Sequence, residues 1–187
     1  AYLNKEIEEV GYDITAISDS IIAPFGIYSK KIASLDELKD GDQIAIPQDP
    51  TNGGRALKVL EQAGLIKVDP AAGYTPEVKD VTENKLNLQF VQVEASQTAA
   101  LLDDVAAGFI NGAHAVDNGY TPNQDAIYIE QVVEGGDNPY INVIVARTAD
   151  KDNETYKKVI EAFKTAETVK VIEDVYKGAY KPAFTLE

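Results

Sequence analysis

Short apolar runs alternate with segments of helical periodicity along most of the chain. The runs that have the length and composition of strands are residues 14–16, 44–46, 88–93, 106–110, 126–129 and 141–146. Helical segments are expected at 34–41, between Asp49 and Gly64, at 96–103, and from Asp152 to the end. Alternation of this kind predicts an α/β architecture with largely parallel strands.

Local signals mark the ends of two of these helices. Ser34 fits an N-cap with Glu37 at the third helical position, a capping box, and this short helix is expected to stop near Gly41. The next helix follows turn residues and stops at Gly64. Its apolar positions recur at helical spacing, at Ala56, Leu57, Leu60 and Ala63.

Two stretches are expected to lack regular structure. Residues 67–87 are rich in proline, glycine, asparagine and charge, and we expect mostly loop there. Residues 134–139 are expected to form a surface loop. Beyond them, two apolar stripes predict the final helices, which are closed by Gly178.

Composition narrows the classes of function. The 187 residues include 17 Lys and Arg against 31 Asp and Glu, which gives a net charge of −14. Such a chain offers no basic patch for nucleic acid and no basic face for a membrane surface. There is no cysteine, which excludes disulfides, a cysteine nucleophile and thiolate metal sites. No apolar run approaches the roughly 20 residues of a membrane-spanning helix.

Few residues could carry catalysis or hold a metal. His114 is the only histidine, and a lone histidine after a strand is most often structural. Asp103 and Asp104 are neighbours on a predicted helix, so their side chains diverge and cannot easily share a proton or a metal. The loop aspartates lack the spacing of an EF-hand. The sequence therefore predicts no catalytic residue, no metal ligand and no cofactor.

The segment from Pro47 to Arg55 is the most informative. Gly53 and Gly54 at a helix start would let backbone N–H groups approach a ligand closely, and the helix dipole favours an anion there. Arg55 lies in the first turn, where its positive charge opposes the helix dipole. It could instead form a bidentate hydrogen-bonded pair with a carboxylate. The alternative is that the two glycines only make the start of the helix more flexible and that Arg55 lies on the surface.

Two asparagines lie at or inside apolar strands. Asn111 follows one strand, and Asn142 lies between Ile141 and Val143 in another. An asparagine amide both donates and accepts, so it can hold the ammonium and carboxylate groups of a zwitterion. The alternative is a strand-end asparagine satisfied by backbone groups. Burial is expected for Asn142, which would then need a bound partner.

Several stretches in this order resemble a known family. They are Gly26-Ile27-Tyr28-Ser29-Lys30-Lys31-Ile32, Ser34-Leu35-Asp36-Glu37-Leu38, Asp49-Pro50-Thr51-Asn52, Gly54-Arg55-Ala56-Leu57, Ala63-Gly64-Leu65-Ile66-Lys67, Ile110-Asn111 and Pro139-Tyr140-Ile141-Asn142-Val143-Ile144-Val145. Over essentially its whole length the chain resembles the NlpA/MetQ family, the methionine-binding lipoproteins of bacterial ABC importers.

The resemblance implies a two-lobed, periplasmic-binding-protein-like (type II) α/β fold with a ligand cleft between the lobes. Lobe I would comprise residues 1–44 and 136–187, and lobe II residues 45–135. Because the family begins with a further N-terminal part, lobe I is expected to be incomplete in this chain. The protein would be a binding protein and not an enzyme, and it would close its lobes over the ligand.

Site residues follow from the resemblance by position. Arg55 would pair with the ligand carboxylate, and Asn111 and Asn142 would fix its amino and carboxyl groups. Tyr2 would lie near the side-chain pocket. Ile21, with Ile22 beside it, stands where the family usually carries an aromatic residue or histidine. Branched aliphatic groups there could select a side chain other than that of methionine.

The resemblance also implies partners and location. The ligand would be a free amino acid, most simply methionine, and the recipient an ABC permease. The protein would be extracytoplasmic, at the cell surface or in the periplasm, and held to the membrane by a lipid anchor outside this chain. The alternatives are a binder of another amino acid or of a methionine-containing dipeptide, a surface adhesion or signalling lipoprotein, and an enzyme such as a lyase or transferase.

Overall fold

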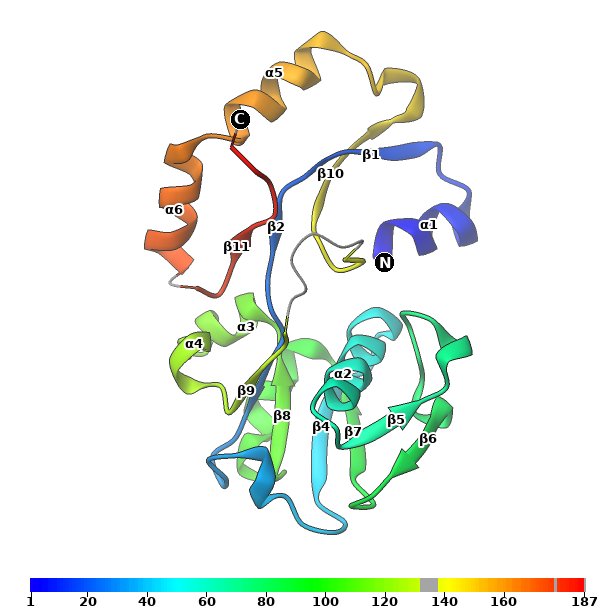
Figure 1. The fold of residues 1–187 in the computed structure, drawn as a ribbon, viewed down its shortest axis with the longest axis vertical. Coiled ribbons are helices and arrows are strands. Elements are labelled where there is room, and N and C mark those ends of the chain that lie inside the picture. Colours follow the sequence, from blue (N-terminus) through cyan, green and yellow to red (C-terminus); the bar gives the residue numbers. More distant parts are fainter. Residues whose placement is uncertain (132–137, 177, 187) are drawn as a thin grey trace. The chain divides into compact units, whose positions relative to one another are not determined.

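The chain passes twice between two structural units. The computed structural model describes residues 1–131, 138–176 and 178–186 (Figure 1). Unit 1 consists of residues 1–23 with 135–187, and unit 2 of residues 24–134. Unit 2 is therefore one continuous segment, inserted between the two parts of unit 1. Most of the surface loop expected at 134–139 lies outside the described residues.

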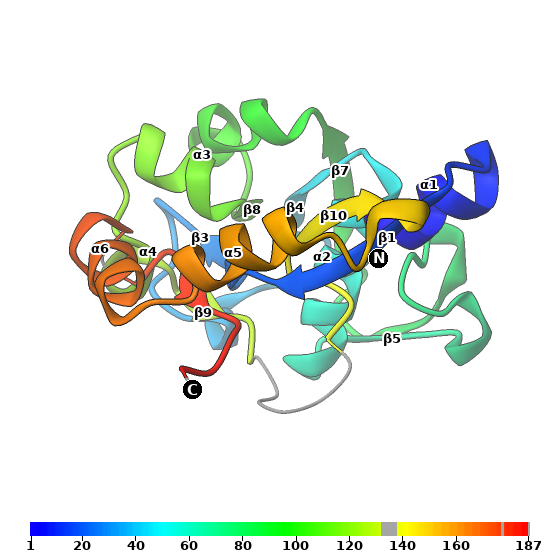
Figure 2. The same ribbon diagram turned by 90° about the horizontal axis from the view of Figure 1, so that it is seen from above.

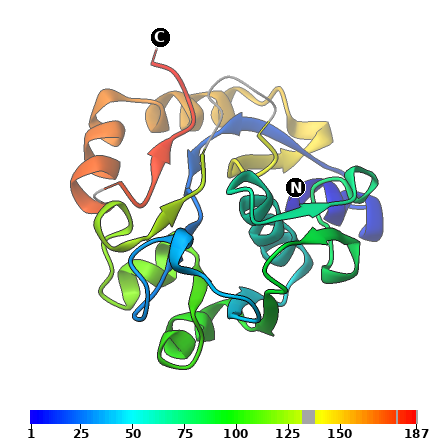
Figure 3. The same cartoon turned by 60° about the horizontal axis from the view of Figure 1, so that its bottom comes forward.

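A five-stranded mixed sheet organises unit 2. Its strand order is β7-β4-β8-β3-β9. The strands are β3 (Gly26–Tyr28), β4 (Gln43–Pro47), β7 (Gln89–Val93), β8 (Ala107–Ile110) and β9 (Tyr128–Ile129). Figure 1 labels β4, β7, β8 and β9, and Figure 3 shows the same unit with the bottom of that view turned forward. β4 is parallel to β7 and β8, whereas β3 is antiparallel to β8 and β9. The largely parallel sheet expected from the sequence is thus found only in its β7-β4-β8 part.

α2 (Pro50–Gln62) and the 3₁₀ helix η4 (Ala95–Asp103) pack against the sheet of unit 2. α3 (Gly112–Asp117) packs on η4, and α4 (Pro122–Asp125) packs on α3. Consecutive residues of β8 point to opposite faces. Phe109 packs in the cluster that contains Leu57 of α2, and Ile110 packs in the cluster that contains Leu102 of η4. Both faces of the central strands are therefore buried, which explains their continuous apolar sequence.

The boundary between the two units lies before β3, and not after residue 44 as the resemblance suggested. Phe25, Ile27 and Tyr28 are almost completely buried within unit 2. β3 pairs on both sides inside the same sheet. A strand with two neighbours in one sheet belongs to that sheet's unit, so residues 24–44 are part of unit 2.

Two segments of unit 2 have another type of secondary structure than the sequence predicted. Residues 67–87 are not mostly loop. They contain the antiparallel pair β5 (Ile66–Val68) and β6 (Val81–Asn84), with 3₁₀ turns η2 (Pro70–Ala72) and η3 (Val78–Asp80) between them. The helix expected at 34–41 is a single 3₁₀ turn, η1 (Leu35–Glu37). Ser34 caps it, and the Glu37 carboxylate accepts the N–H of Ala33.

The described residues of unit 1 form two short antiparallel ladders and three α-helices. β1 (Ile14–Asp19) pairs with β10 (Val143–Arg147), and β2 (Ile21–Ile22) pairs with β11 (Lys181–Pro182). The helices are α1 (Tyr2–Val10), α5 (Glu154–Phe163) and α6 (Ala166–Tyr176), and η5 (Thr148–Asp150) follows β10. Figure 2 shows α1, α5 and α6 together with β1 and β10. α1 was not anticipated from the sequence, and β11 interrupts the helical C-terminus that was expected.

Candidate functional site

The start of α2 is held at the carboxyl end of β4. Asp49 is the N-cap, and its Oδ1 accepts the backbone N–H of Asn52 at 2.9 Å. Pro50 occupies the first turn, where its missing N–H costs nothing. The helix predicted between Asp49 and Gly64 is confirmed. In sheets with parallel strands, this edge is where ligands bind.

Arg55 is buried and paired within unit 2. Its Nε lies 3.1 Å from Oε1 of Glu130, and its Nη2 lies 2.5 Å from Oε2. Each side chain is only 9% exposed. The Phe25 ring lies under the guanidinium, 5.5 Å from Cζ, and the Phe25 N–H donates to Oε2 at 2.9 Å. The alternative of a surface arginine is therefore wrong.

Glu130 was missed by the sequence analysis. The signal was present, because a glutamate directly after the apolar run 126–129 needs a partner if it is buried. The fork expected of Arg55 exists, and the carboxylate that occupies it here belongs to the same chain. The pair leaves this part of the site close to neutral, with charges of both signs held in place.

A second polar group lies one turn earlier on α2. Nδ2 of Asn52 donates to both carboxylate oxygens of Asp49 at 3.1 Å, and Oδ1 of Asn52 accepts from Nδ2 of Asn111 at 2.9 Å. Asn111 is the N-cap residue of α3, directly after β8. Its Oδ1 is buried and has no hydrogen-bond partner among the described residues. A buried acceptor of this kind needs a donor from a ligand or water.

The glycines at the start of α2 have a packing role. A Cβ on Gly53 would lie 2.6 Å from the Pro47 carbonyl oxygen, and one on Gly54 would lie 2.7 Å from Cα of Thr75. Neither position has room for a side chain against the neighbouring backbone. Close packing of helix on strand and loop therefore explains the glycines without a ligand.

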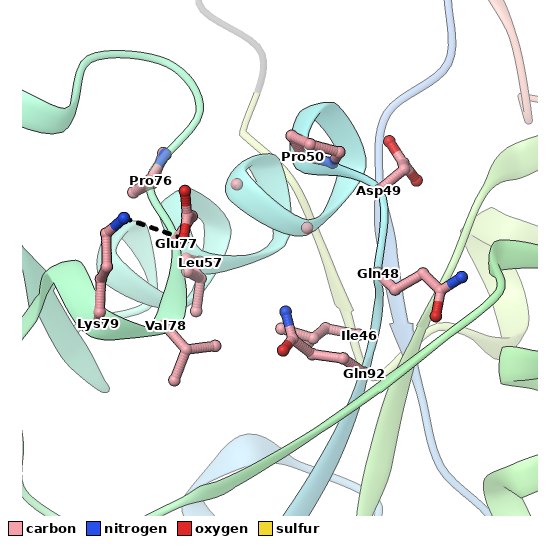
Figure 4. Close-up of a pocket in the computed structure, with 12 residues that line it drawn as sticks. Ile46, Gln48, Asp49, Pro50, Leu57, Pro76, Glu77, Val78, Lys79 and Gln92 are labelled. Carbon is pink, nitrogen blue, oxygen red and sulfur yellow. Dashed lines mark ion pairs between the residues drawn. The ribbon is translucent and has the colours of Figure 1, made fainter.

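A pocket of about 450 Å³ lies on the side of α2 that faces the 76–79 loop (Figure 4). Ile46, Leu57 and Val78 supply apolar walls, and Gln48 and Gln92 supply amides. Glu77 and Lys79 line it as an ion pair at 3.1 Å. None of the side chains predicted to bind the ligand lines this pocket.

The remaining predicted site residues belong to unit 1. Asn142 is exposed, not buried, and β10 directly after it is itself mostly half-buried or exposed, so the apolar neighbours in sequence do not enclose it. Its N–H donates to the Ile21 carbonyl at 2.9 Å, and its carbonyl accepts the N–H of Ser20 at 2.9 Å. Ile21 is half-buried in β2, next to fully buried Ile22, and Tyr2 is 65% exposed at the start of α1. The structure thus brings together Ile21 and Asn142 in one unit, and Asn52, Arg55 and Asn111 in the other.

Other candidates for chemistry have structural explanations. Asp103 forms an exposed ion pair with Lys30 at 2.7 Å, which agrees with a solvated helix end. His114 lies half-buried on α3. Within residues 1–131, 138–176 and 178–186, no cluster of three or more His, Cys, Asp or Glu could hold a metal ion. None of the helices described there is long and apolar enough to cross a membrane.

Comparison with solved structures defines the class of this fold. A nutrient-binding protein from Burkholderia cenocepacia, solved bound to methionine, matches with a TM-score of 0.88 and 35% identity, over 98% of this chain and 76% of that one. A periplasmic substrate-binding protein of an ABC transporter from Coxiella burnetii matches with a TM-score of 0.86 and 34% identity, over 97% and 75%. The chain has the mixed α/β fold of periplasmic substrate-binding proteins.

The family is equally clear. A model of the NlpA lipoprotein family matches residues 1–184, and the chain belongs to this family. The D-methionine-binding lipoprotein MetQ of Escherichia coli strain K12 is 41% identical over 179 residues, 95% of this chain. The chain spans 65% of the length of that relative. These relatives are named as binding proteins and not as enzymes.

The packing role of Gly54 predicts the sign of a mutation. In an open helix position, a change from glycine to alanine stabilises by up to about 1 kcal/mol. Gly54→Ala is expected to destabilise the protein by about 1–3 kcal/mol, because the new Cβ overlaps the Thr75 backbone. Urea denaturation followed by circular dichroism measures the difference, and a stabilised variant would contradict the packing role.

The Arg55–Glu130 pair predicts a large effect from a small change. Glu130→Gln keeps the shape of the side chain but leaves the buried guanidinium uncompensated, with an expected cost of about 3–5 kcal/mol. The matched control is Asp103→Asn, which removes an exposed partner of Lys30 and should cost less than about 1 kcal/mol. Equal unfolding free energies for the two variants would argue against a buried pair.

Proposed function

We propose that the protein is the extracytoplasmic solute-binding component of an ABC importer and that it binds a free amino acid, methionine, without catalysis. The observation that carries the proposal is the buried Oδ1 of Asn111, which has no hydrogen-bond partner among the described residues. The Nδ2 of the same amide donates to Asn52 at the start of α2, the helix that also bears Arg55. Family membership and the methionine-binding relatives support the same ligand class.

The proposed recognition is that of a zwitterion. Asn111 Oδ1 would accept from the ligand's α-ammonium group, which supplies the donor that this oxygen lacks. Arg55 would attract the ligand carboxylate, with Glu130 holding the guanidinium in a fixed orientation. Because Arg55 and Glu130 compensate each other, the site favours a ligand that carries both charges over one that carries a single charge.

The other half of the proposed site comes from unit 1. The two units would be the two lobes, with the ligand bound between them. Asn142 would add amide contacts to the ligand's charged groups, and Ile21 and Tyr2 would contact its side chain. Ile21 offers an aliphatic surface, which suits the thioether chain of methionine and also a branched side chain. Another amino acid or a methionine-containing dipeptide is therefore the second candidate.

The proposed partners follow from the relatives. A substrate-binding protein of an ABC transporter hands its ligand to a permease, and one relative is named as such a protein. A lipoprotein is held at the membrane by a lipid anchor, and the family model is that of a lipoprotein. We propose the same partner and the same location in the cell envelope for this protein.

A thermal-shift screen tests the ligand. L-methionine, D-methionine, the other amino acids and methionyl dipeptides would each be added to the purified protein. A ligand at 100 times its dissociation constant adds about 2.7 kcal/mol of stability, which raises the melting temperature visibly. A shift with methionine is the expected result. A shift only with a branched amino acid would support the second candidate, and no shift with any of these ligands would contradict the proposed function.

Arg55 is tested by a variant that keeps its charge. Arg55→Lys retains the cation but loses the planar fork, so methionine affinity in calorimetric titration is expected to fall by at least about tenfold. Lys58→Ala, one turn further along α2, removes a cation that already pairs with Glu61 and should leave the affinity unchanged. Wild-type affinity in Arg55→Lys would remove Arg55 from the site.

A further inference from the structure

Three side chains in unit 2 form a hydrogen-bonded series with a defined direction. Asp49 accepts from the side-chain nitrogen of Asn52 at 3.1 Å, through both carboxylate oxygens. Asn52 accepts in turn from the side-chain nitrogen of Asn111 at 2.9 Å. The series ends at Oδ1 of Asn111, which is buried and has no partner among the described residues.

The direction of this series is set at Asp49. An ionised carboxylate can only accept, so the amide of Asn52 must turn its NH₂ group toward Asp49. Oδ1 of Asn52 then faces Asn111 and can only accept, so Asn111 must donate to it from its own NH₂ group. The amide oxygen of Asn111 is consequently the atom left for a ligand. An asparagine amide alone has no such preference, because its two ends differ little in shape.

We propose that Asp49 and Asn52 are positioning residues that make Asn111 present an acceptor, and that this is how the site selects a ligand with an α-ammonium group. This inference rests on the proposed function and adds an explanation of why the site would prefer a ligand with an amino group. Capping of α2 does not require the hydrogen-bonded series. The cap uses Oδ1 of Asp49 on the backbone N–H of Asn52, whereas the series also uses Oδ2.

Asp49→Asn separates the two roles of this residue. Asparagine is as good an N-cap as aspartate, so α2 should still begin at Pro50. The introduced amide can keep its oxygen on the cap, but its NH₂ group then faces the NH₂ group of Asn52. Rotation of the Asn52 amide relieves this clash and turns Asn111 round as well. The site would then present a donor where the ligand's ammonium group needs an acceptor.

The measurement is a ratio of two affinities. Calorimetric titration would use methionine and the analogue in which hydrogen replaces the α-amino group. In Asp49→Asn, methionine affinity is expected to fall by at least about tenfold relative to that of the analogue. Unfolding without ligand should match the wild type. A purely structural role for Asp49 would lower both affinities together or lower the stability, and leave the ratio unchanged.

The double variant Asp49→Asn with Asn52→Asp provides a rescue. It moves the carboxylate one step along the series, where it accepts from the introduced amide on one side and from Asn111 on the other. The affinity ratio should return toward the wild-type value. Failure to recover it, in a variant that unfolds like the wild type, would overturn the inference.

The outcomes also separate this inference from the proposed function. A wild-type protein that binds methionine, together with an Asp49→Asn variant that keeps the wild-type ratio, would leave the function standing and remove the positioning role. A wild-type protein that binds neither compound would overturn both. A wild-type protein that binds the analogue as tightly as methionine would show that Asn111 does not recognise the ammonium group, which would overturn the inference.

Discussion

The buried ion pair between Arg55 and Glu130 is the interaction on which the arrangement of unit 2 depends. It joins α2 to the segment after β9, and Glu130 also accepts the N–H of Phe25 just before β3. Neither charge could remain buried without the other. Because Arg55 and Asn52 lie three residues apart, and so on neighbouring positions of one helix, the pair also orients the start of α2 toward Asn111.

The chemistry of the site follows from these fixed polar groups more than from net charge. The chain carries a charge of −14, yet the pair of Arg55 and Glu130 is locally balanced. A zwitterionic amino acid is likewise neutral overall, so the acidic surface neither attracts nor repels it strongly. For the proposed amino-acid ligand, selectivity would come from short-range groups whose donors and acceptors are held in one orientation. The series from Asp49 to Asn111 is the arrangement that we propose for this role.

Sequence reasoning predicted the parts of the fold that local physics determines. The strand at 44–46 and the helix between Asp49 and Gly64 follow from apolar runs and turn residues. The antiparallel pairing of β3 with β8 could not be read in this way, because pairing depends on contacts between residues about 80 positions apart. The resemblance placed the unit boundary after residue 44, whereas the pairing of β3 with β8 and β9 makes residues 24–44 part of unit 2.

Sequence reasoning found some residues of the candidate site and missed others. Arg55 and Asn111 were singled out from residue type and position, but Glu130 was not, because a pair is visible only when both members are placed in space. Asn142 was expected to be buried from its apolar neighbours in sequence. It is exposed, and the strand that follows it is not a buried core strand either, since only Ala146 of β10 is buried.

The antiparallel pairing of β3 with β9 has a consequence for the modularity of this protein. β3 and β9, which lie near the two ends of unit 2, are adjacent strands, and the backbone N–H of Glu130 donates to the Phe25 carbonyl with an N···O distance of 2.8 Å. A segment whose two ends are fastened to each other can be inserted into a host chain without disturbing its own interior. Phe25 and Glu130 hold each other near the two ends of unit 2, so the interior of this unit does not depend on where its host chain enters and leaves.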